Sequence, residues 1–374
     1  MLQRQNCRGK RLLERPLAVE QRKRNCQEHA PYDPIRRDDR PTHHRGKQYD
    51  RQSHDHDITV IAKAGRRSIS MNMHAGKITL AWLTRLWLVW ITLSSAGLAF
   101  ASMPDTHSAA ALHAKYTSLS ERLQHNPFQR ALSLDSSESS GELKGDIYAR
   151  VDYPFATVSK ALNDPAHWCD VMILHINTKF CRATTDSAHT VLSVNIGKKT
   201  PQPIEDAYPI EFAYRVNAAT ANYLEIQLTA QEGPLSTRNY HIQLHAVPIE
   251  NGGTFLHLTY SYDYGMAGRL AMKSYLATIG SGKVGFTLTG TQSNGQPEHI
   301  GGMRGLVERN TMRYYLAIDA YLGALATPPP RQLQKRLQGW FTSTEQYPRQ
   351  LREVTRTAYL VMKRGEYRRQ QSMQ

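Results

Sequence analysis

Three tyrosines spaced two residues apart are the first candidates for ligand chemistry. Tyr260, Tyr262 and Tyr264 follow Leu256 and Leu258 at the same spacing, so they share one face of an expected strand. Such a ladder could line a cavity for an aromatic or sterol-like molecule, while its hydroxyl groups bond to a polar head. The alternative is an aromatic stripe in the core or on the surface, and the sequence leaves both interpretations open.

A second set of candidates lies on a long helix expected over residues 303–325. An apolar stripe of this helix includes Tyr314, and Asn310 interrupts the stripe, so its amide needs a partner from the protein or from a ligand. Arg309 and Arg313 are four residues apart and repel each other unless an anion or a carboxylate lies nearby. We place Asn310, Tyr314 and Arg309 in the predicted ligand-binding set. A solvated charged face is the alternative for the arginines.

Trp168 and the cysteines form a third group. Trp168 joins the predicted ligand-binding set, with a structural role as its alternative. Cys169 and Cys181 are the two cysteines that follow residue 101, and in an exported chain they are expected to form a disulfide. This bond would close a short loop and stabilise the fold by about 3 kcal/mol in the chain-entropy model. Two buried free thiols are the alternative.

Motifs for catalysis are mostly missing from the sequence. There is no Gly-x-Ser-x-Gly, no His-Glu-x-x-His and no Cys-x-x-Cys, which disfavours serine hydrolases, zinc proteases and thioredoxin-like enzymes. The stretch 280–283 (GSGK) is similar to a phosphate-binding loop, but Ala277 and Val284 stand where that motif requires Gly and Ser or Thr. An acid–base pair of Glu308 with a tyrosine remains open. Glu308 is also spaced to form an ion pair with Arg304. No cofactor and no metal site are expected.

Strands and helices must position these residues, and their order follows from the hydrophobic periodicity. Helical spacing over residues 108–132 is followed by an expected loop at 133–141. The period changes to two over residues 145–153, and short helices are expected after Pro154 and Pro165. Further strand-like runs cover 173–183, 191–196, 208–216, 223–229, 240–246 and 254–264. A helix is expected over 265–279 and two basic helices over 331–369. Short connections between the strands predict an antiparallel sheet.

Residues 144–326 resemble the START-like, Bet v 1-like (SRPBCC) superfamily. The likeness is carried by residues 145–149 (GDIYA), 154–158 (PFATV), 162–165 (LNDP) and Trp168, together with the order of elements. The resemblance implies an α+β helix-grip fold. In this fold a curved antiparallel sheet of about six to seven strands surrounds a long C-terminal helix, and a cavity between them takes lipids or other apolar molecules. Residues 102–143, an N-terminal helix and linker, and residues 327–374, a basic helical tail, are additions to it.

The segment Met71 to Ala101 has the pattern of a secretory signal peptide. Lys77 and Arg85 precede an uncharged run over residues 86–100, and the run ends in a small-x-small cleavage site, Ala99-Phe100-Ala101. The run has 15 residues, whereas a membrane-spanning helix needs roughly 20. We therefore expect cleavage after Ala101 and a periplasmic or secreted product. Residues 1–70 contain few apolar side chains, and we expect them to be disordered and not to belong to the functional protein.

Charge gives limited information about partners. Residues 1–101 hold 19 Lys and Arg against nine Asp and Glu, a net charge of +10, and residues 102–374 hold 28 against 23, a net charge of +5. The remaining positive charge, which is concentrated after Arg331, is compatible with peripheral contact with an anionic membrane. No nucleic-acid partner is expected, and the oligomeric state stays open.

The sequence thus favours a binding protein over an enzyme. We expect an exported soluble protein that binds, and carries, a lipid or another apolar small molecule in a helix-grip cavity. An enzyme of the cyclase or hydrolase type on the same fold is one alternative. The other is an envelope scaffold that binds a membrane or a partner through its basic C-terminal helices.

Overall fold

The structure, a computed structural model, describes residues 108–187, 189–278 and 280–373. These residues fall within one compact unit, Leu93–Gln374. The expected signal peptide and the segment before it lie outside the described residues. Within the described ranges, no helix is both long enough and apolar enough to cross a membrane.

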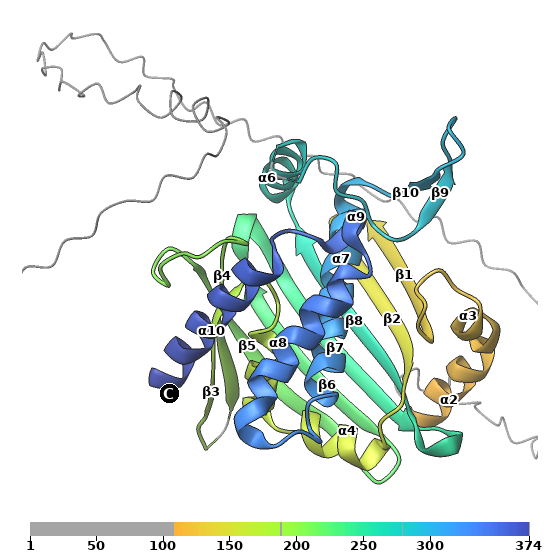
Figure 1. Cartoon of the computed structure of the whole chain (residues 1–374), viewed down its shortest axis with the longest axis vertical. Helices are drawn as coiled ribbons and strands as arrows, with labels where there is room; N and C mark the ends of the chain where they lie inside the picture. Colours follow the sequence, from red (N-terminus) through yellow and green to blue (C-terminus); the bar gives the residue numbers. More distant parts are fainter. Residues whose placement is uncertain (1–107, 188, 279, 374) are drawn as a thin grey trace, which may run out of the picture. The chain divides into compact units, whose positions relative to one another are not determined.

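Eight antiparallel strands form one curved sheet in the order β1-β2-β8-β7-β6-β5-β4-β3 (Figure 1). The strands are β1 (Leu132–Ser139), β2 (Glu142–Val151), β3 (Thr178–Thr185), β4 (Thr190–Ile196), β5 (Tyr208–Ala219), β6 (Leu224–Glu232), β7 (Thr237–Pro248) and β8 (Thr254–Tyr264). Strands β3 to β8 form a meander, and β2 joins the sheet beside β8. A separate hairpin consists of β9 (Leu288–Thr291) and β10 (Pro297–His299). The expected antiparallel α+β fold is confirmed.

Strand β1 corrects one expectation. Residues 133–141, which were expected to form a loop, supply most of this strand, and it pairs with β2 along its whole length from Leu132↔Ala149 to Ser139↔Glu142. Only the first three residues of β1 are buried, so its serine-rich second half shows no hydrophobic alternation. Gly141 makes the tight hairpin turn with a φ of 102°, a conformation that favours glycine. Pairing with β2, and not burial of apolar side chains, therefore explains the second half of this strand.

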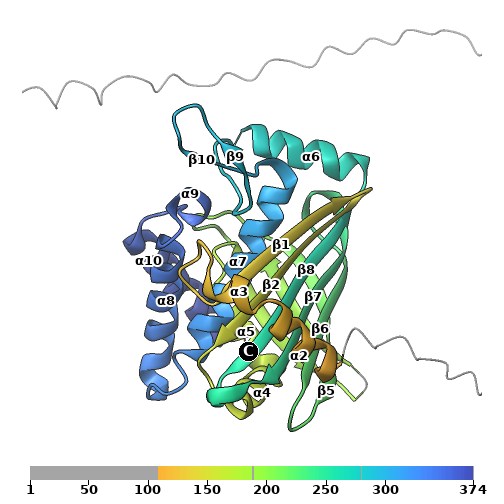
Figure 2. The same cartoon turned by 90° about the vertical axis from the view of Figure 1, so that its right-hand side faces the viewer.

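The helices cover both faces of the sheet (Figure 2). They are α2 (Ala109–Ser118), α3 (Ser120–Gln124), α4 (Phe155–Leu162), α5 (Pro165–Met172), α6 (Met266–Ala277), α7 (Gly302–Leu322), α8 (Pro329–Glu345), α9 (Pro348–Leu351) and α10 (Arg356–Ser372). Leu112, Leu119 and Leu123 pack against Val247 and Phe255 on the outer face. The long helix α7 crosses the inner, concave face, where it contacts β1, β2 and β8. This is the helix-grip arrangement.

Helix α7 approaches the sheet closely at Gly145 of β2. A Cβ atom added at Gly145 would overlap Thr311 Oγ1 and lie 3.2 Å from Thr311 Cβ. The Thr311 hydroxyl donates a hydrogen bond to Val307 O at 2.8 Å, which fixes its position on the helix. A glycine at position 145 therefore lets the helix approach the sheet at this point.

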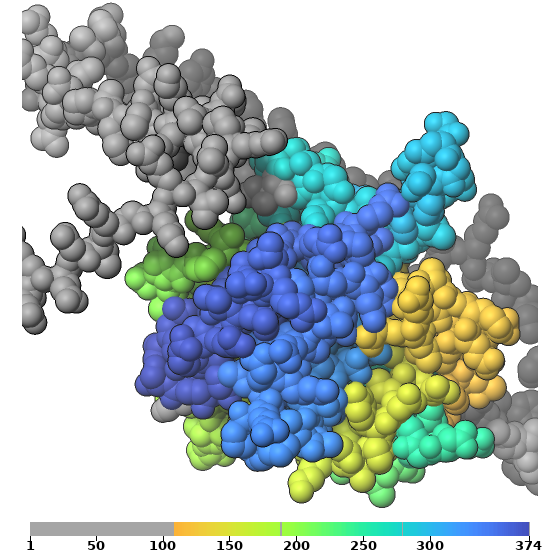
Figure 3. All heavy atoms as spheres, in the orientation of Figure 1, coloured from red at the N-terminus to blue at the C-terminus, as the bar shows by residue number. Residues whose placement is uncertain are grey.

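The tail after Pro328 packs onto the domain (Figure 3). Trp340 of α8 donates its indole hydrogen to Arg313 O of α7 at 3.1 Å. On α10, the Glu366 carboxylate accepts from Lys179 Nζ of β3 at 3.0 Å and from Lys363 Nζ at 2.8 Å, and all three side chains are buried. A buried charge is tolerated when it is paired. The two expected basic helices are present in the structure. Helix α8 packs against α7, and α10 packs against the edge strand β3.

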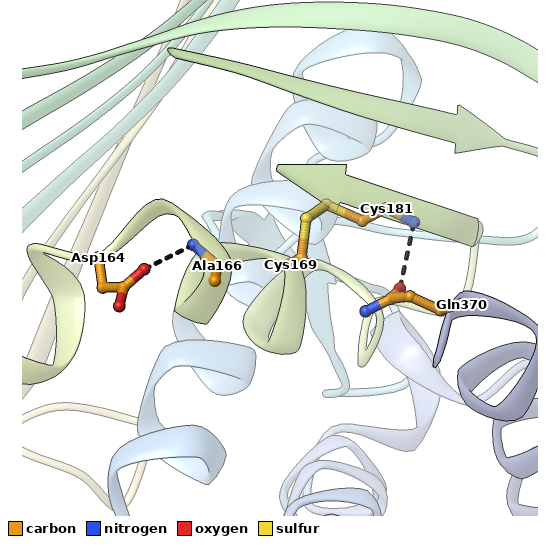
Figure 4. The surroundings of a disulfide bond; sticks show 5 residues. All are labelled: Asp164, Ala166, Cys169, Cys181 and Gln370. Carbon is orange, nitrogen blue, oxygen red and sulfur yellow. Dashed lines mark hydrogen bonds between the residues drawn. A yellow bond between two sulfur atoms is a disulfide. The ribbon is translucent and has the colours of Figure 1, made fainter. Parts of the chain in front are cut away.

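The expected disulfide is present between Cys169 of α5 and Cys181 of β3 (Figure 4). Asp164 caps α5 by accepting from Ala166 N at 2.8 Å, and Gln370 of α10 accepts from Cys181 N at 3.1 Å. The two cysteines are 12 residues apart in the sequence. The disulfide thus links the edge strand β3 to helix α5, and the tail also contacts this helix.

Replacing Gly145 by Ala tests the close approach of helix and sheet. We expect a loss of about 1–3 kcal/mol in the free energy of unfolding, because the added methyl group forces α7 or β2 to move. The double variant Gly145→Ala with Thr311→Ala should recover part of this loss, since the overlapping hydroxyl is gone. Urea unfolding of the wild type, both single variants and the double variant measures the coupling. Purely additive losses would contradict the predicted overlap.

Candidate functional site

A cavity of about 580 Å³ lies between the concave face of the sheet and helices α6 and α7. Its walls come from the loop before β3, from β4, β5 and the loop between them, from the turn between β6 and β7, from β7 and β8, and from the two helices. This is the place where a helix-grip fold was expected to hold a ligand. Its volume falls in the range of small-molecule sites.

The structure brings together five of the seven predicted ligand-binding residues. Tyr260, Tyr262, Arg309, Asn310 and Tyr314 all line the cavity. Strand alternation placed the two tyrosines of β8 on the inner face, and helical spacing placed the other three on the face of α7 that borders the cavity. Their proximity is a property of the structure, whereas their contact with a ligand remains a prediction.

The other two predicted residues lie elsewhere. Tyr264 is buried beyond the end of the cavity, and its hydroxyl donates to Glu138 Oε1 of β1 at 2.9 Å. Trp168 is fully buried on α5 and donates its indole hydrogen to Leu162 O at 2.8 Å. Both side chains have protein partners and neither lines the cavity, so the structural alternative describes them better.

Aromatic rings make up the sheet side of the cavity. Tyr240 of β7 stacks on Tyr262 with ring centroids 5.1 Å apart, and Tyr260 contacts Tyr314 at 5.2 Å. The ring of His175, from the loop before β3, stacks on Tyr314 at 4.7 Å. Sequence reasoning missed Tyr240, although it alternates with buried Ile242 and Leu244 on the inner face of β7. This period was the signal that could have found it.

The phenol groups of this wall stay protonated at neutral pH. Burial raises the pKa of Tyr240 to about 12 and also raises the pKa values of Tyr260, Tyr262 and Tyr314. Each phenol can therefore donate a hydrogen bond. Tyr262 donates to Met272 Sδ at 3.8 Å, the Tyr240 hydroxyl is hydrogen-bonded to Thr237 Oγ1 at 2.6 Å, and Tyr260 has Asn310 as its hydrogen-bond partner. The four tyrosines thus form an uncharged aromatic part of the cavity wall.

Cationic side chains gather where α7 and the loop between β4 and β5 border the cavity. Arg313 and Lys199 both bind Glu353 Oε1 at 2.7 Å, and Lys283 lies 3.9 Å from Glu353 Oε2. Glu353 comes from the loop between α9 and α10, so the tail supplies the carboxylate that the spacing of the two arginines required. Arg309 donates to Val284 O at 3.2 Å and has no ion-pair partner in the described part of the chain. Burial, followed by repulsion from Arg313, lowers the pKa of Arg309 to about 10.

Glu308 lies outside the cavity and on a different side of α7. Its carboxylate accepts from Ser136 Oγ at 2.6 Å, from Thr287 N at 3.0 Å and from Thr287 Oγ1 at 2.6 Å. The expected direct pair with Arg304 is absent among the described ion pairs, and Ser136 bridges the two side chains by accepting from Arg304 Nη2 at 3.0 Å. Glu308 therefore positions the segment before β9. It cannot form an acid–base pair with a tyrosine of the cavity.

His175 is a buried, neutral member of the cavity wall. Its side chain is 3% exposed. Burial lowers its pKa well below 6.5, and the nearby cations, Arg313 first among them, lower it further. Nδ1 accepts a hydrogen bond from Asn177 N at 3.2 Å, so the ring hydrogen of the neutral form lies on Nε2. The loop position of His175 gave no periodic signal that could have predicted this.

Comparisons with known proteins bear on the fold. No family model matches the sequence, and no curated protein matches it. The structure is similar to a norcoclaurine synthase point mutant from Thalictrum flavum, with 13% identity over 38% of this chain and 91% of that chain and a TM-score of 0.28. It is also similar to the human StAR-related lipid transfer protein 5, with 11% identity, 45% and 89% coverage and a TM-score of 0.26. A third is the ZhuI aromatase/cyclase from Streptomyces sp. R1128, with 10% identity, 56% and 95% coverage and a TM-score of 0.26.

The chain has a START-like helix-grip fold. This statement rests on the order of its own elements, in which β2, the pair α4 and α5, the meander β3 to β8 and the gripped helix α7 follow one another. The low identities and TM-scores of the three structures carry no inference about what this START-like domain binds or does. Any function must therefore be argued from the cavity.

The buried neutral His175 predicts a loss of stability in acid. Its pKa is below 6.5 in the folded state and about 6.5 in the unfolded state, so only the unfolded chain takes up the proton as the pH falls below 6.5. This side chain should then lower the free energy of unfolding by up to about 1.4 kcal/mol per pH unit. The variant His175→Asn keeps an acceptor near Nδ1 but does not titrate. Urea unfolding from pH 7 to pH 5 should show a steeper decline for the wild type, and parallel curves would contradict the prediction.

Proposed function

We propose that this protein is an exported carrier that binds a lipid or another apolar small molecule in the cavity between the sheet and α7. The observation that carries the proposal is the cavity itself. It has a volume of about 580 Å³ and an aromatic wall formed by Tyr240, Tyr260, Tyr262 and Tyr314. Apolar walls with a few placed polar groups are typical of small-molecule sites.

Helix α6 is the wall that we propose to move when a ligand enters. It contributes Met272 and Tyr275 to the cavity, but among its residues only Gly268 and Met272 are buried. On its outer side Met266 and Leu270 are 90% and 72% exposed. Elements that bury few apolar side chains open at a lower free energy than the core. Helix α7, which is buried along most of its length, is a less suitable gate.

Export is supported by two independent features. The sequence from Met71 to Ala101 has the pattern of a signal peptide. Cys169 and Cys181 form a disulfide, and disulfides persist in oxidising compartments. Together they support a site of action outside the cytoplasm, where the carrier would exchange its ligand.

The binding proposal predicts that a ligand is retained on purification. The full chain, expressed in a host that exports it, should yield an apolar molecule on extraction with organic solvent, identified by mass spectrometry. The variant Leu306→Trp places a large ring in the cavity wall and should reduce the retained amount at least about ten-fold. The variant Val361→Trp is the matched control, because Val361 is 64% exposed on α10 and does not line the cavity. Wild-type protein that neither retains a molecule nor binds the neutral dye Nile red would refute the proposal.

The export proposal predicts the first residue of the exported product. Cleavage after Ala101 gives a chain that starts at Ser102, which N-terminal sequencing would detect. The variant Ala101→Leu should block processing, since signal peptidase requires a small residue at this position. Met103→Leu, two residues beyond the expected bond, should leave processing intact. A product that starts elsewhere, or that stays in the cytoplasm, would contradict this assignment.

A further inference from the structure

We propose that the cavity takes an amphipathic anion, whose carboxylate or phosphate head binds Arg309 and the adjacent donors of the helix side while its apolar body lies along the tyrosines. This inference rests on the proposed binding function and adds the chemical class of the ligand. Four observations carry it, namely an unpaired buried cation, buried donors without acceptors, an excess of positive charge, and an aromatic surface beside that charge.

Arg309 is the unpaired buried cation. The residue is 2% exposed and lines the cavity. Its hydrogen bond to Val284 O uses Nη1 alone, and within the described residues no carboxylate lies within ion-pair distance. A buried cation is normally paired, because desolvation without a partner is unfavourable by several kcal/mol. An anionic ligand head would supply the partner and accept a bidentate pair of hydrogen bonds.

Two more donors that line the cavity have no acceptor in the described part of the protein. Nε2 of His175 carries the ring hydrogen, because Nδ1 accepts from Asn177 N, and it forms no hydrogen bond. Nε of Arg313 is likewise buried and unpaired. Both side chains are at least 97% buried and both line the cavity. Buried donors without partners are rare in native proteins. Oxygen atoms of a carboxylate or phosphate accept several such bonds at once.

The charges near this wall are not balanced by the protein. Arg313, Lys199 and Lys283 lie 2.7–3.9 Å from the Glu353 carboxylate, and Arg309 is close enough to Arg313 to be repelled by it. Asp206 is a further carboxylate of the cavity lining, where Lys198, Lys199, Arg309 and Arg313 outnumber it. Repulsion from Arg313 contributes to the lowered pKa of Arg309, and Glu353 offsets only part of it. The positive potential therefore favours an anion over a neutral or cationic head.

The aromatic wall fixes the orientation of the ligand. Tyr240, Tyr260 and Tyr262 belong to the sheet and are uncharged, whereas both arginines belong to α7, which also carries Tyr314, the fourth tyrosine of the wall. A ligand with its head at α7 keeps its body on the tyrosines, as apolar burial requires. A molecule that is charged at both ends would place one charge on an apolar surface. The structure therefore favours a single anionic head on an apolar body.

A matched set of twelve-carbon probes tests the inference on the full chain. Laurate, dodecyl phosphate and dodecanol share a chain and differ in the head, and each is titrated as a competitor of bound Nile red. At least one of the two anions should bind about ten-fold or more tightly than dodecanol. The tighter of the two anions identifies the head as a carboxylate or a phosphate.

The variant Arg309→Gln should remove this preference. We expect the affinity for the preferred anion to fall at least about ten-fold and the affinity for dodecanol to change less than about two-fold. Arg331→Gln removes the same charge from an exposed position on α8 and should leave all affinities unchanged. If Arg309→Gln does not fold, Lys199→Gln, whose side chain is 19% exposed, should show a smaller loss in the same direction.

Equal binding of all three probes, unaffected by Arg309→Gln, would overturn the anionic head while the binding function stood. Failure of Nile red and of every probe to bind would overturn both. Tighter binding of the anions that is lost in Arg309→Gln and kept in Arg331→Gln supports the inference.

Discussion

Burial of three charged side chains on one helix is the constraint that the rest of the domain has to meet. Helix α7 lies between the sheet and the tail and is buried on nearly every face. Glu308, Arg309 and Arg313 are nevertheless part of it, and each needs a partner because a buried charge is otherwise unfavourable. Strand β1 and the segment before β9 supply hydrogen bonds to Glu308, and the tail supplies Glu353 to Arg313. The added elements therefore supply partners for two of the three charges, whereas Arg309 has only the Val284 carbonyl.

Much of the fold could be predicted because the apolar residues of its strands and helices recur with a clear period. Alternation over residues 145–151 and 254–264 predicted β2 and β8, and it also placed Tyr260 and Tyr262 on the inner face. Helical spacing placed Asn310 and Tyr314 on the face of α7 that borders the cavity. Such patterns report which face of an element is buried. They therefore predicted the part of the site that projects from regular elements.

The rest depends on contacts between residues that are distant in the sequence. Strand β1 was missed because its second half shows no apolar alternation and is held by pairing with β2 and by polar contacts of Ser136 and Glu138 with distant residues. The docking of α10 depends on Lys179 and Glu366, which are 187 residues apart, and no local pattern predicts that they meet. Tyr264 and Trp168 had the expected residue types, but each found a protein partner away from the cavity. Burial alone did not distinguish a cavity wall from a core.

Two adjacent residues of α7 differ in what explains their burial. Glu308 and Arg309 are neighbours in the sequence and both are at most 2% exposed, yet successive residues of a helix point in directions about 100° apart. Glu308 points to β1 and accepts hydrogen bonds from the protein, so its burial is explained by the fold. Arg309 borders the cavity with one carbonyl as its acceptor. A methionine of similar length would fill this space without an uncompensated charge. Folding therefore does not account for the guanidinium, whereas recognition of an anion does.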